Sequence, residues 1–148
     1  MNTRVPVTYR SATPEDLPFI YSTWFKSYRN TEWARCMSND TFFFHHKAIL
    51  KSILEGKTAQ ITLICSEDDP DQLYGYCVAD VVGPVSLVHF IYVKYNFRKL
   101  GLAKELIKHL GYWDGPGTKF ITHLPRAYMS IKDKYKLEYN PYLLPGDY

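Results

Sequence analysis

The segment between Ser86 and Leu110 restricts the fold of this chain more than any other part of the sequence. It opens with SLVHFIYV, a run that is apolar at odd and even positions, as in a strand buried on both faces in the middle of a sheet. A short polar loop follows. Apolar residues then return at the spacing of one helix face, at Ala103, Leu106, Ile107 and Leu110. A buried strand that leads through a tight loop into an amphipathic helix indicates an α/β domain with a central sheet.

The rest of the chain alternates between strand-like and helix-like patterns. Strands are expected at residues 5–9, 60–65, 73–82 and 119–124. Helices are expected from Thr13 through Tyr28, from Asn39 or Asp40 to Gly56, from Lys99 to Gly111 and, as a shorter helix, over residues 125–136. Because a helix separates the strands 86–93 and 119–124, these two are expected to run parallel. The order of elements predicts an α/β sandwich with a mixed sheet.

Length and composition fit one globular domain that spans residues 1–148. Hydrophobic residues make up 46 % and charged residues 22 %, which excludes the disordered and fibrous classes. No apolar run is long enough for a membrane span, and the first residues, MNTRVPVTYRS, lack the apolar core of a secretory signal. Cys36, Cys65 and Cys77 have no C-x-x-C spacing. An odd number of cysteines without a leader predicts reduced thiols and a cytoplasmic location.

The positive charge is concentrated in the C-terminal half of the chain. The formal net charge is +3, yet the stretch from Lys94 to Lys136 holds ten Lys and Arg residues against three acidic residues. This excess suggests an anionic ligand on that side of the molecule. Lysines scattered over solvated helix surfaces would explain the charge equally well.

The loop between Arg98 and Ala103, with the pattern R-x-x-G-x-A, has the composition of a phosphate-binding loop. Backbone N–H groups at the start of a helix point toward one place, and the helix dipole favours an anion there. Gly101 leaves the backbone open to close approach, and Arg98 and Lys99 add positive charge. The alternative is a strand-to-helix turn that contains glycine for conformational reasons only.

These residues resemble the pyrophosphate loop of the GCN5-related N-acetyltransferase (GNAT) superfamily. The family pattern is (Gln/Arg)-x-x-Gly-x-(Gly/Ala) after a strand that ends in an apolar residue and Val, and residues 92–103, YVKYNFRKLGLA, match it. The stretch RSATPEDL at 10–17 is similar to the family's first strand and helix, and so is a hairpin with Gly75 in its second strand. The resemblance covers about residues 5–125 and identifies the chain as a compact, bacterial or phage-type member.

The resemblance implies a fold, a reaction and a set of binding residues. The fold is a mixed, mostly antiparallel sheet flanked by helices, with an opening between strands 4 and 5 that holds the cosubstrate acetyl-CoA. An acceptor amine attacks the thioester directly, and the thiolate leaves. The acceptor pocket is bordered by the first two helices and the loop Asn30–Ser38. The implied cofactor-binding residues are Ile91, Tyr92, Val93, Arg98, Lys99, Leu100, Gly101, Leu102 and Ala103.

Two residues are candidates for proton transfer. His89 lies on the fourth strand, on the face expected for Ile91 and Val93, where members of the family often carry a general base. Tyr135 lies where the family places the tyrosine that protonates the thiolate, and Tyr128 and Tyr139 are its alternatives. A core role remains open for the histidine and for all three tyrosines. No metal site is expected, because the histidines of this chain lack cysteines or other ligands at metal-binding spacing.

The sequence therefore favours an acetyl-CoA-dependent N-acetyltransferase that acts on a primary amine of a small molecule or a protein. A non-catalytic CoA-binding or interaction module with the same fold is one alternative. A phage-type enzyme that modifies nucleic-acid bases is another, since the basic half would suit nucleic acid as a partner. No membrane partner is expected, and either a monomer or a homodimer is compatible with the sequence.

Overall fold

The computed structural model describes residues 6–82, 85–110, 119–125, 128–131 and 136–143. Its strands are β1 (Val7–Ser11), β2 (Gln60–Ser66), β3 (Leu73–Val82), β4 (Val85–Val93), β5 (Lys119–Ile121) and β6 (Leu137–Tyr139). Its helices are η1 (Pro14–Asp16), α1 (Leu17–Arg29), α2 (Glu32–Arg35), α3 (Asn39–Leu54), η2 (Tyr95–Phe97), α4 (Leu102–Leu110) and α5 (Tyr128–Ile131).

The six strands form one sheet in chain order, β1 to β6. Strands β1 to β4 pair antiparallel, whereas β5 pairs parallel with β4 and β6 pairs parallel with β5. This confirms the expected mixed, mostly antiparallel sheet and the parallel arrangement of the strands around residues 86–93 and 119–124. The crossover helix α4 makes the parallel β4–β5 connection possible.

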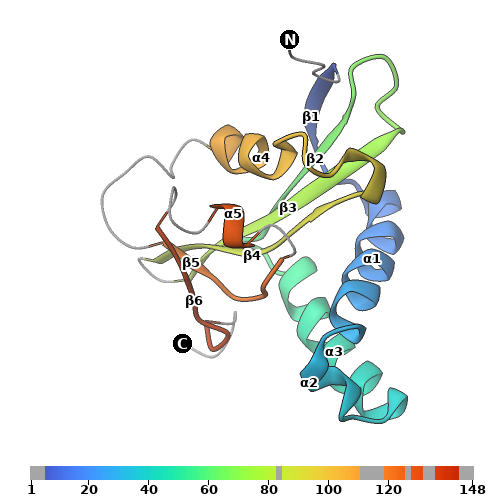
Figure 1. Ribbon diagram of the computed structural model, residues 1–148, viewed down its shortest axis with the longest axis vertical. Coiled ribbons are helices and arrows are strands. Elements are labelled where there is room, and N and C mark those ends of the chain that lie inside the picture. Colours follow the sequence, from blue (N-terminus) through green and yellow to red (C-terminus); the bar gives the residue numbers. More distant parts are fainter. Residues whose placement is uncertain (1–5, 83–84, 111–118, 126–127, 132–135, 144–148) are drawn as a thin grey trace.

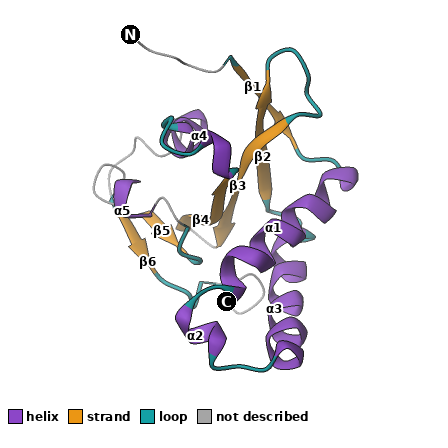
Figure 2. Ribbon diagram, turned by 45° about the vertical axis from the view of Figure 1, so that its right-hand side comes forward, coloured by secondary structure: helices purple, strands orange, loops and turns teal. Residues whose placement is uncertain are grey.

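Helices cover both faces of the sheet, and each face has its own hydrophobic core (Figures 1 and 2). The first core joins α1 and α3 to β2, β3 and β4, and Trp24, Phe42, Tyr76 and Phe90 are its largest buried members. The second core joins α4, α5 and β6 to the opposite face, through residues such as Leu106, Ile107, Ile121 and Ile131. The sheet is thus buried on both sides along β3 and β4, as the apolar run of β4 predicts.

The first helical segment begins after Thr13, as the sequence predicts, but its first turn is the 3₁₀ helix η1 and α1 itself begins at Leu17. Side chains fix this start. The Asp16 carboxylate accepts the Thr13 backbone N–H (2.8 Å), which is the reciprocal bond of a capping box. The same carboxylate forms a two-point ion pair with Arg10 of β1, at 2.8 and 3.0 Å. This pair therefore ties the first strand of the sheet to the first helix.

Several element boundaries differ from the sequence prediction. Strand β1 covers Val7–Ser11 instead of residues 5–9, and α3 ends at Leu54, before Gly56. Helix α4 begins at Leu102 rather than near Lys99, because Lys99 (φ 66°) and Gly101 (φ 78°) adopt left-handed backbone conformations that a right-handed helix excludes. Strand β5 ends at Ile121, where it leaves β4. The segment Asn30–Ser38, which has no clear period in the sequence, contains the short helix α2.

Candidate cofactor and catalytic site

Strands β4 and β5 separate halfway along β4. They pair only at Leu87–Phe120 and Val88–Ile121, and one further bond runs from the Thr122 N–H to the Val88 carbonyl (3.0 Å). Beyond this point the second half of β4 has no strand partner on this side among the described residues. The opening expected between the fourth and fifth strands is therefore confirmed, and its vertex lies at His89 and Thr122.

The backbone groups that border this opening follow from the β3–β4 ladder. Just past the end of β4, the Lys94 N–H donates to the Tyr74 carbonyl (2.8 Å). In an antiparallel ladder every second residue bonds to the same neighbour, so Tyr92 is also bonded to β3. Ile91 and Val93 turn their N–H and C=O groups the other way, toward the opening. Of the predicted strand residues, Ile91 has its N–H and C=O available to a ligand, and Val93 has its N–H available, because the Val93 carbonyl accepts a hydrogen bond from Arg98.

A β-bulge interrupts β4 at His89. Val78 pairs with Phe90 and Ala79 pairs with Val88, so His89 is the extra residue on its strand. The bulge breaks the simple alternation of faces.

Because of this break, Val88 and Ile91 both pack in the core on the α4 side, although they are three positions apart. Phe90, between them, packs in the core on the α1 side. The expectation that His89 shares the face of Ile91 and Val93 is therefore wrong, since its ring bonds to Asp80 and Thr122 instead.

The loop from Arg98 to Ala103 leads from the end of β4 into α4. Gly101 is exposed, and a Cβ atom placed on it would have no heavy atom within 4 Å. The first intrahelical bond runs from the Glu105 N–H to the Gly101 carbonyl (3.0 Å). Among the described residues, no backbone carbonyl accepts a hydrogen bond from the amides of residues 99–103. The start of α4 thus offers free amides and open space to an anion.

Arg98 shapes this loop with its side chain. Its Nε–H donates to the Val93 carbonyl (3.0 Å), and its guanidinium lies 5.5 Å from the ring centroid of Tyr95. These contacts bridge the two ends of the turn between β4 and α4. Arg98 therefore positions the loop at the same time as it adds positive charge beside it.

His89 lies at the centre of a buried polar chain. The ring is 0 % exposed; its Nε2 lies 3.1 Å from Asp80 Oδ2, and its Nδ1 lies 2.8 Å from Thr122 Oγ1. The other oxygen of Asp80 accepts the Thr58 hydroxyl (2.5 Å), and Thr122 Oγ1 also lies 2.9 Å from His123 Nδ1. Both ring nitrogens of His89 are therefore occupied by protein groups, so His89 has no direct path to an acceptor.

His123 connects this hydrogen-bond network to the helices α1 and α3. Its ring centroid lies 5.0 Å from that of Trp24, 5.1 Å from that of Tyr28 and 5.7 Å from that of His46. Burial, and next the positive charges that His46 and His89 would carry, hold the pKa of His123 well below its ordinary value. Burial lowers the pKa of His46 to about 4. Both imidazoles are therefore neutral at pH 7.

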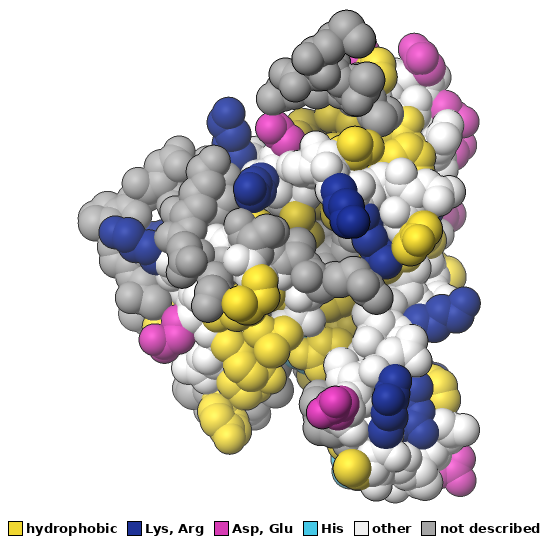
Figure 3. Space-filling model, viewed as in Figure 1, with side chains coloured by type: hydrophobic (Ala, Val, Ile, Leu, Met, Phe, Trp, Pro, Cys, Tyr) yellow, Lys and Arg dark blue, Asp and Glu magenta, His cyan; other side chains and the backbone are white. Residues whose placement is uncertain are grey.

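The three candidate tyrosines have different positions. Tyr135 lies outside the described residues. The Tyr128 hydroxyl donates to the Leu137 carbonyl (3.2 Å), so Tyr128 has a structural contact. Tyr139 on β6 is partly exposed and hydrogen-bonds to Tyr28, whose hydroxyl accepts the Leu124 N–H (2.9 Å). Figure 3 shows hydrophobic side chains gathered over β6 and the segment that follows it.

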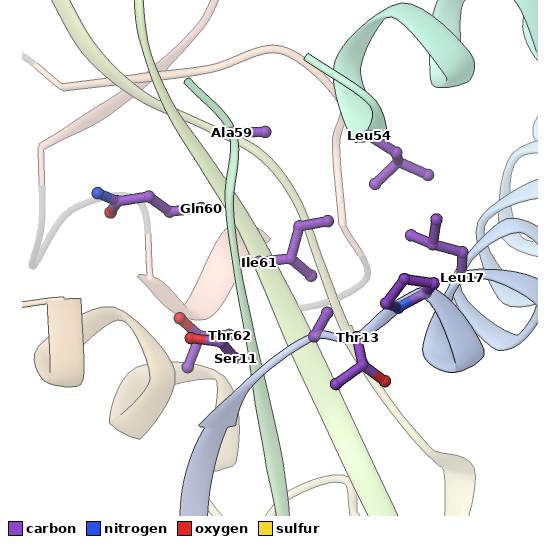
Figure 4. A pocket seen from close by; sticks show the side chains of 10 residues that line it. Ser11, Thr13, Leu17, Leu54, Ala59, Gln60, Ile61 and Thr62 are labelled. Atoms are coloured by element: carbon purple, nitrogen blue, oxygen red, sulfur yellow. The ribbon is translucent and has the colours of Figure 1, made fainter. Parts of the chain in front are cut away.

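A separate pocket of about 530 Å³ lies between the ends of β1 and β2 and the helices α1 and α3. Figure 4 shows Leu17 and Leu54 opposite Ile61 across it. Its lining contains no titratable side chain, so it offers no group for acid–base chemistry. No three His, Cys, Asp or Glu residues of the described ranges are placed to hold a metal ion. Within those ranges no helix is both long and apolar enough to cross a membrane.

Solved structures resemble this chain in fold. A candidate acetyltransferase from Pyrococcus furiosus has a TM-score of 0.60 at 18 % identity, over 86 % of this chain and 91 % of that chain. The chain has the GNAT fold. A candidate acetyltransferase from Clostridium difficile 630 gives a TM-score of 0.58 at 16 % identity, over 88 % of each chain. A tetramutant of the BH1408 protein from Bacillus halodurans gives 0.56 at 11 % identity, over 87 % and 90 %. No family model and no curated protein matches the sequence.

Four members of the buried hydrogen-bond network escaped the sequence prediction: Thr58, Asp80, Thr122 and His123. Thr122 and His123 are adjacent, but no motif links them to Thr58 or Asp80. One signal was present, because Asp80 is a charged residue inside a strand that is otherwise apolar or aromatic around it. Such a residue needs a buried partner, although the sequence does not say which.

Proposed function

We propose that this protein is an acetyl-CoA-dependent N-acetyltransferase that transfers the acetyl group to a primary amine of a small molecule or a protein. One observation carries the proposal: the free amides of residues 99–103 follow the strand whose Ile91 and Val93 backbone groups face the opening. If the loop binds the pyrophosphate of acetyl-CoA, the pantetheine arm attached to it would lie extended along this edge of β4. The GNAT fold supports the same ligand.

In the proposed reaction the amine nitrogen attacks the thioester carbonyl carbon. A C–N bond forms, the C–S bond breaks, and CoA leaves as a thiolate. Backbone N–H groups on the free edge of β4, at Ile91 and Val93, would stabilise the negative charge on the carbonyl oxygen. Tyr135 stays the proposed proton donor to the thiolate. His89 stays the proposed acceptor of the amine proton, which has to reach its buried ring through other groups.

The first test changes Gly101 to Glu. The new carboxylate would occupy the open space beside the free amides and repel the pyrophosphate, so we expect the affinity for CoA to fall at least 100-fold. Titration calorimetry with CoA measures this, and circular dichroism checks the fold. Because Gly101 has φ 78°, some loss of stability will accompany the change.

The matched control is Phe44→Glu, which adds the same charge at an exposed position on α3. We expect this variant to bind CoA like the original protein. A folded Gly101→Glu protein with unaltered CoA affinity would show that the loop is only a turn, and the proposed function would lose its support.

A non-catalytic CoA-binding module is the second candidate, and one observation favours it: His89 is fully buried with both ring nitrogens bonded to protein groups. Thiol release from acetyl-CoA in the presence of a panel of amines separates the two. Release that depends on the amine supports the enzyme. CoA binding without release from any amine supports the module.

A further inference from the structure

The hydrogen bonds of the buried polar network all donate in the direction of Asp80. The network consists of Thr58, Asp80, His89, Thr122 and His123, and the chemistry of these groups fixes which of them donates and which accepts. An ionised carboxylate only accepts hydrogen bonds. Asp80 accepts the Thr58 hydroxyl at Oδ1, and Oδ2 faces His89 Nε2 at 3.1 Å. Where an ionised Asp80 faces a singly protonated His89 ring, this geometry requires the proton of His89 on Nε2 and leaves the lone pair on Nδ1.

The direction continues through Thr122. His89 Nδ1, as an acceptor, takes the Thr122 hydroxyl proton over 2.8 Å. The oxygen of Thr122 then accepts the Nδ1–H of His123 over 2.9 Å. The remaining contact of this hydroxyl, 3.4 Å to the His89 carbonyl, is longer and competes weakly. His123 is thereby held with its proton on Nδ1 and with a free lone pair on Nε2.

The surroundings of His123 point to a polar ligand at this end of the chain. Two side-chain nitrogens next to its ring, Trp24 Nε1 and His46 Nε2, are buried and have no hydrogen-bond partner in the described part of the protein. Trp24 is 0 % and His46 5 % exposed, so each lacks solvent as well. Buried polar atoms of this kind are normally satisfied by a partner. These rings belong to α1 and α3, which the GNAT resemblance places beside the acceptor.

We propose that His123 Nε2 is the base that takes the proton from the acceptor amine, and that Thr122 and His89 relay a proton to a buried Asp80–His89 pair. This inference rests on the proposed function. In it, His123 rather than His89 contacts the acceptor amine. The amine proton moves to His123 Nε2, the Nδ1 proton moves to Thr122 Oγ1, and the Thr122 proton moves to His89 Nδ1. The product of the relay is an imidazolium beside the Asp80 carboxylate, while CoA leaves as a thiolate.

The relay explains why a weakly basic histidine would serve. His123 is neutral at pH 7, so its lone pair is available, but it would hold a proton poorly in its buried site. The groups that face it are His46 on α3, Tyr28 on α1 and His89 on β4, and none of them brings a negative charge. Among the described residues of the hydrogen-bond network, Asp80 is the one that carries a carboxylate, and it lies at the far end beside His89. The proton therefore gains its stabilisation by moving along the chain.

The first experiment reads the imidazole tautomers directly and needs no acceptor. In protein labelled with ¹⁵N on histidine, two-bond ¹H–¹⁵N correlations at pH 7 report which ring nitrogen carries the proton. We expect Nδ1–H for His123, the less common form of a neutral imidazole, and Nε2–H for His89. An Asp80→Asn variant offers an N–H donor to His89 Nε2, which should reverse the chain and move the His123 proton to Nε2. An Nε2–H form of His123 in the original protein would overturn the proposal.

The second experiment tests the relay in turnover, by amine-dependent thiol release between pH 6 and 9. Thr122→Val keeps the shape of the side chain but removes the hydroxyl, and we expect kcat to fall about 10²-fold with CoA affinity unchanged. Thr122→Ser should restore most of the rate. Thr23→Val is the matched control, because it removes a hydroxyl bonded to Tyr76 outside the relay, and it should leave kcat unchanged.

The outcomes separate the two proposals. If the original protein binds no CoA and releases no thiol, the proposed function fails, whatever the tautomers are. If the original protein is active and Thr122→Val keeps its kcat and its pH profile, the relay is wrong and the proposed function stands. If CoA binds but no amine supports thiol release, the His123 tautomer decides whether the directed chain exists.

Discussion

At the scale of single residues, His89 and Gly101 differ in how accessible they are to a ligand. His89 is central but inaccessible, because the bulge in β4 turns it into a network between Asp80 and Thr122. Gly101 has the opposite character, since it is exposed and has open space where a side chain would be. His89 is therefore inaccessible to a ligand, whereas the space beside Gly101 is open to one.

Replacement of His89 by Asn tests its part in the reaction. We expect kcat to fall roughly 10²- to 10⁴-fold, because the proton acceptor at the end of the relay is lost, while CoA affinity stays the same. Unfolding free energy should fall by about 1–3 kcal/mol, since Asp80 loses a buried partner. The measurements are kcat/KM between pH 6 and 9, CoA titration and thermal unfolding. A His89→Asn enzyme that is fully active across this range would remove His89 from the mechanism.

At the scale of elements, two junctions shape the molecule. Between α1 and α3, Arg29 donates to the carbonyls of Ala34 and Met37 and to the side chain of Asn39 (2.9 Å), and so holds the segment that contains α2. Between β1 and α1, the pair of Arg10 and Asp16 fixes the start of the helix. Both junctions use charged hydrogen bonds where the chain changes direction.

The Asp16 junction predicts a dependence of stability on acid. The hydrogen bonds from Arg10, followed by those from Thr13, lower the pKa of Asp16 from 3.8 to about 2. A lowered carboxylate pKa stabilises the fold above about pH 4, and this stability is lost as the pH falls toward 2. The contribution is about 2 kcal/mol, because one pKa unit corresponds to about 1.4 kcal/mol. Denaturant unfolding at pH 7 and pH 2.5 of the original protein and of Asp16→Asn measures it.

In that comparison, the original protein should lose more stability on acidification than Asp16→Asn does, by about the contribution of this one group. An equal loss in the two proteins would show that the ion pair with Arg10 adds nothing to stability.

At the scale of the whole molecule, the sheet is continuous from β1 to the first half of β4 and then opens. The opening, the loop after β4 and the start of α4 lie together, as Figure 1 shows for β4 and α4. Ligand binding at this place should therefore stabilise the fold that brings these elements together.

Acetyl-CoA should raise the melting temperature of the protein. A ligand that binds only the folded state at 100 times its Kd adds about 2.7 kcal/mol to the free energy of unfolding. Differential scanning fluorimetry with acetyl-CoA up to millimolar concentration measures the shift, and Phe44→Glu serves as a control that should respond equally. The absence of any shift at millimolar ligand would contradict the assignment of the opening as a CoA site.

Local sequence patterns were enough to predict the order of the main elements and the loop before α4. Periodicity placed β3 at its observed bounds, and Gly101 in the R-x-x-G-x-A pattern identified the turn into α4, because local backbone preferences and hydrophobic spacing act within a few residues. The exact start of α4 escaped prediction, since the left-handed conformation of Lys99 is not encoded by a glycine or an asparagine there.

The contacts between the buried polar residues depend on the folding of the whole domain. Thr58, Asp80, His89 and Thr122 come from four separate stretches of sequence, and the sheet register with its bulge brings them within hydrogen-bond distance. One residue more or less in β4 would turn His89 to another partner, because side chains alternate between the faces of a strand. The position of His123 against α1 and α3 likewise depends on helix packing across the sheet. Such long-range contacts follow from the packing of the whole domain, and no local pattern in the sequence specifies them.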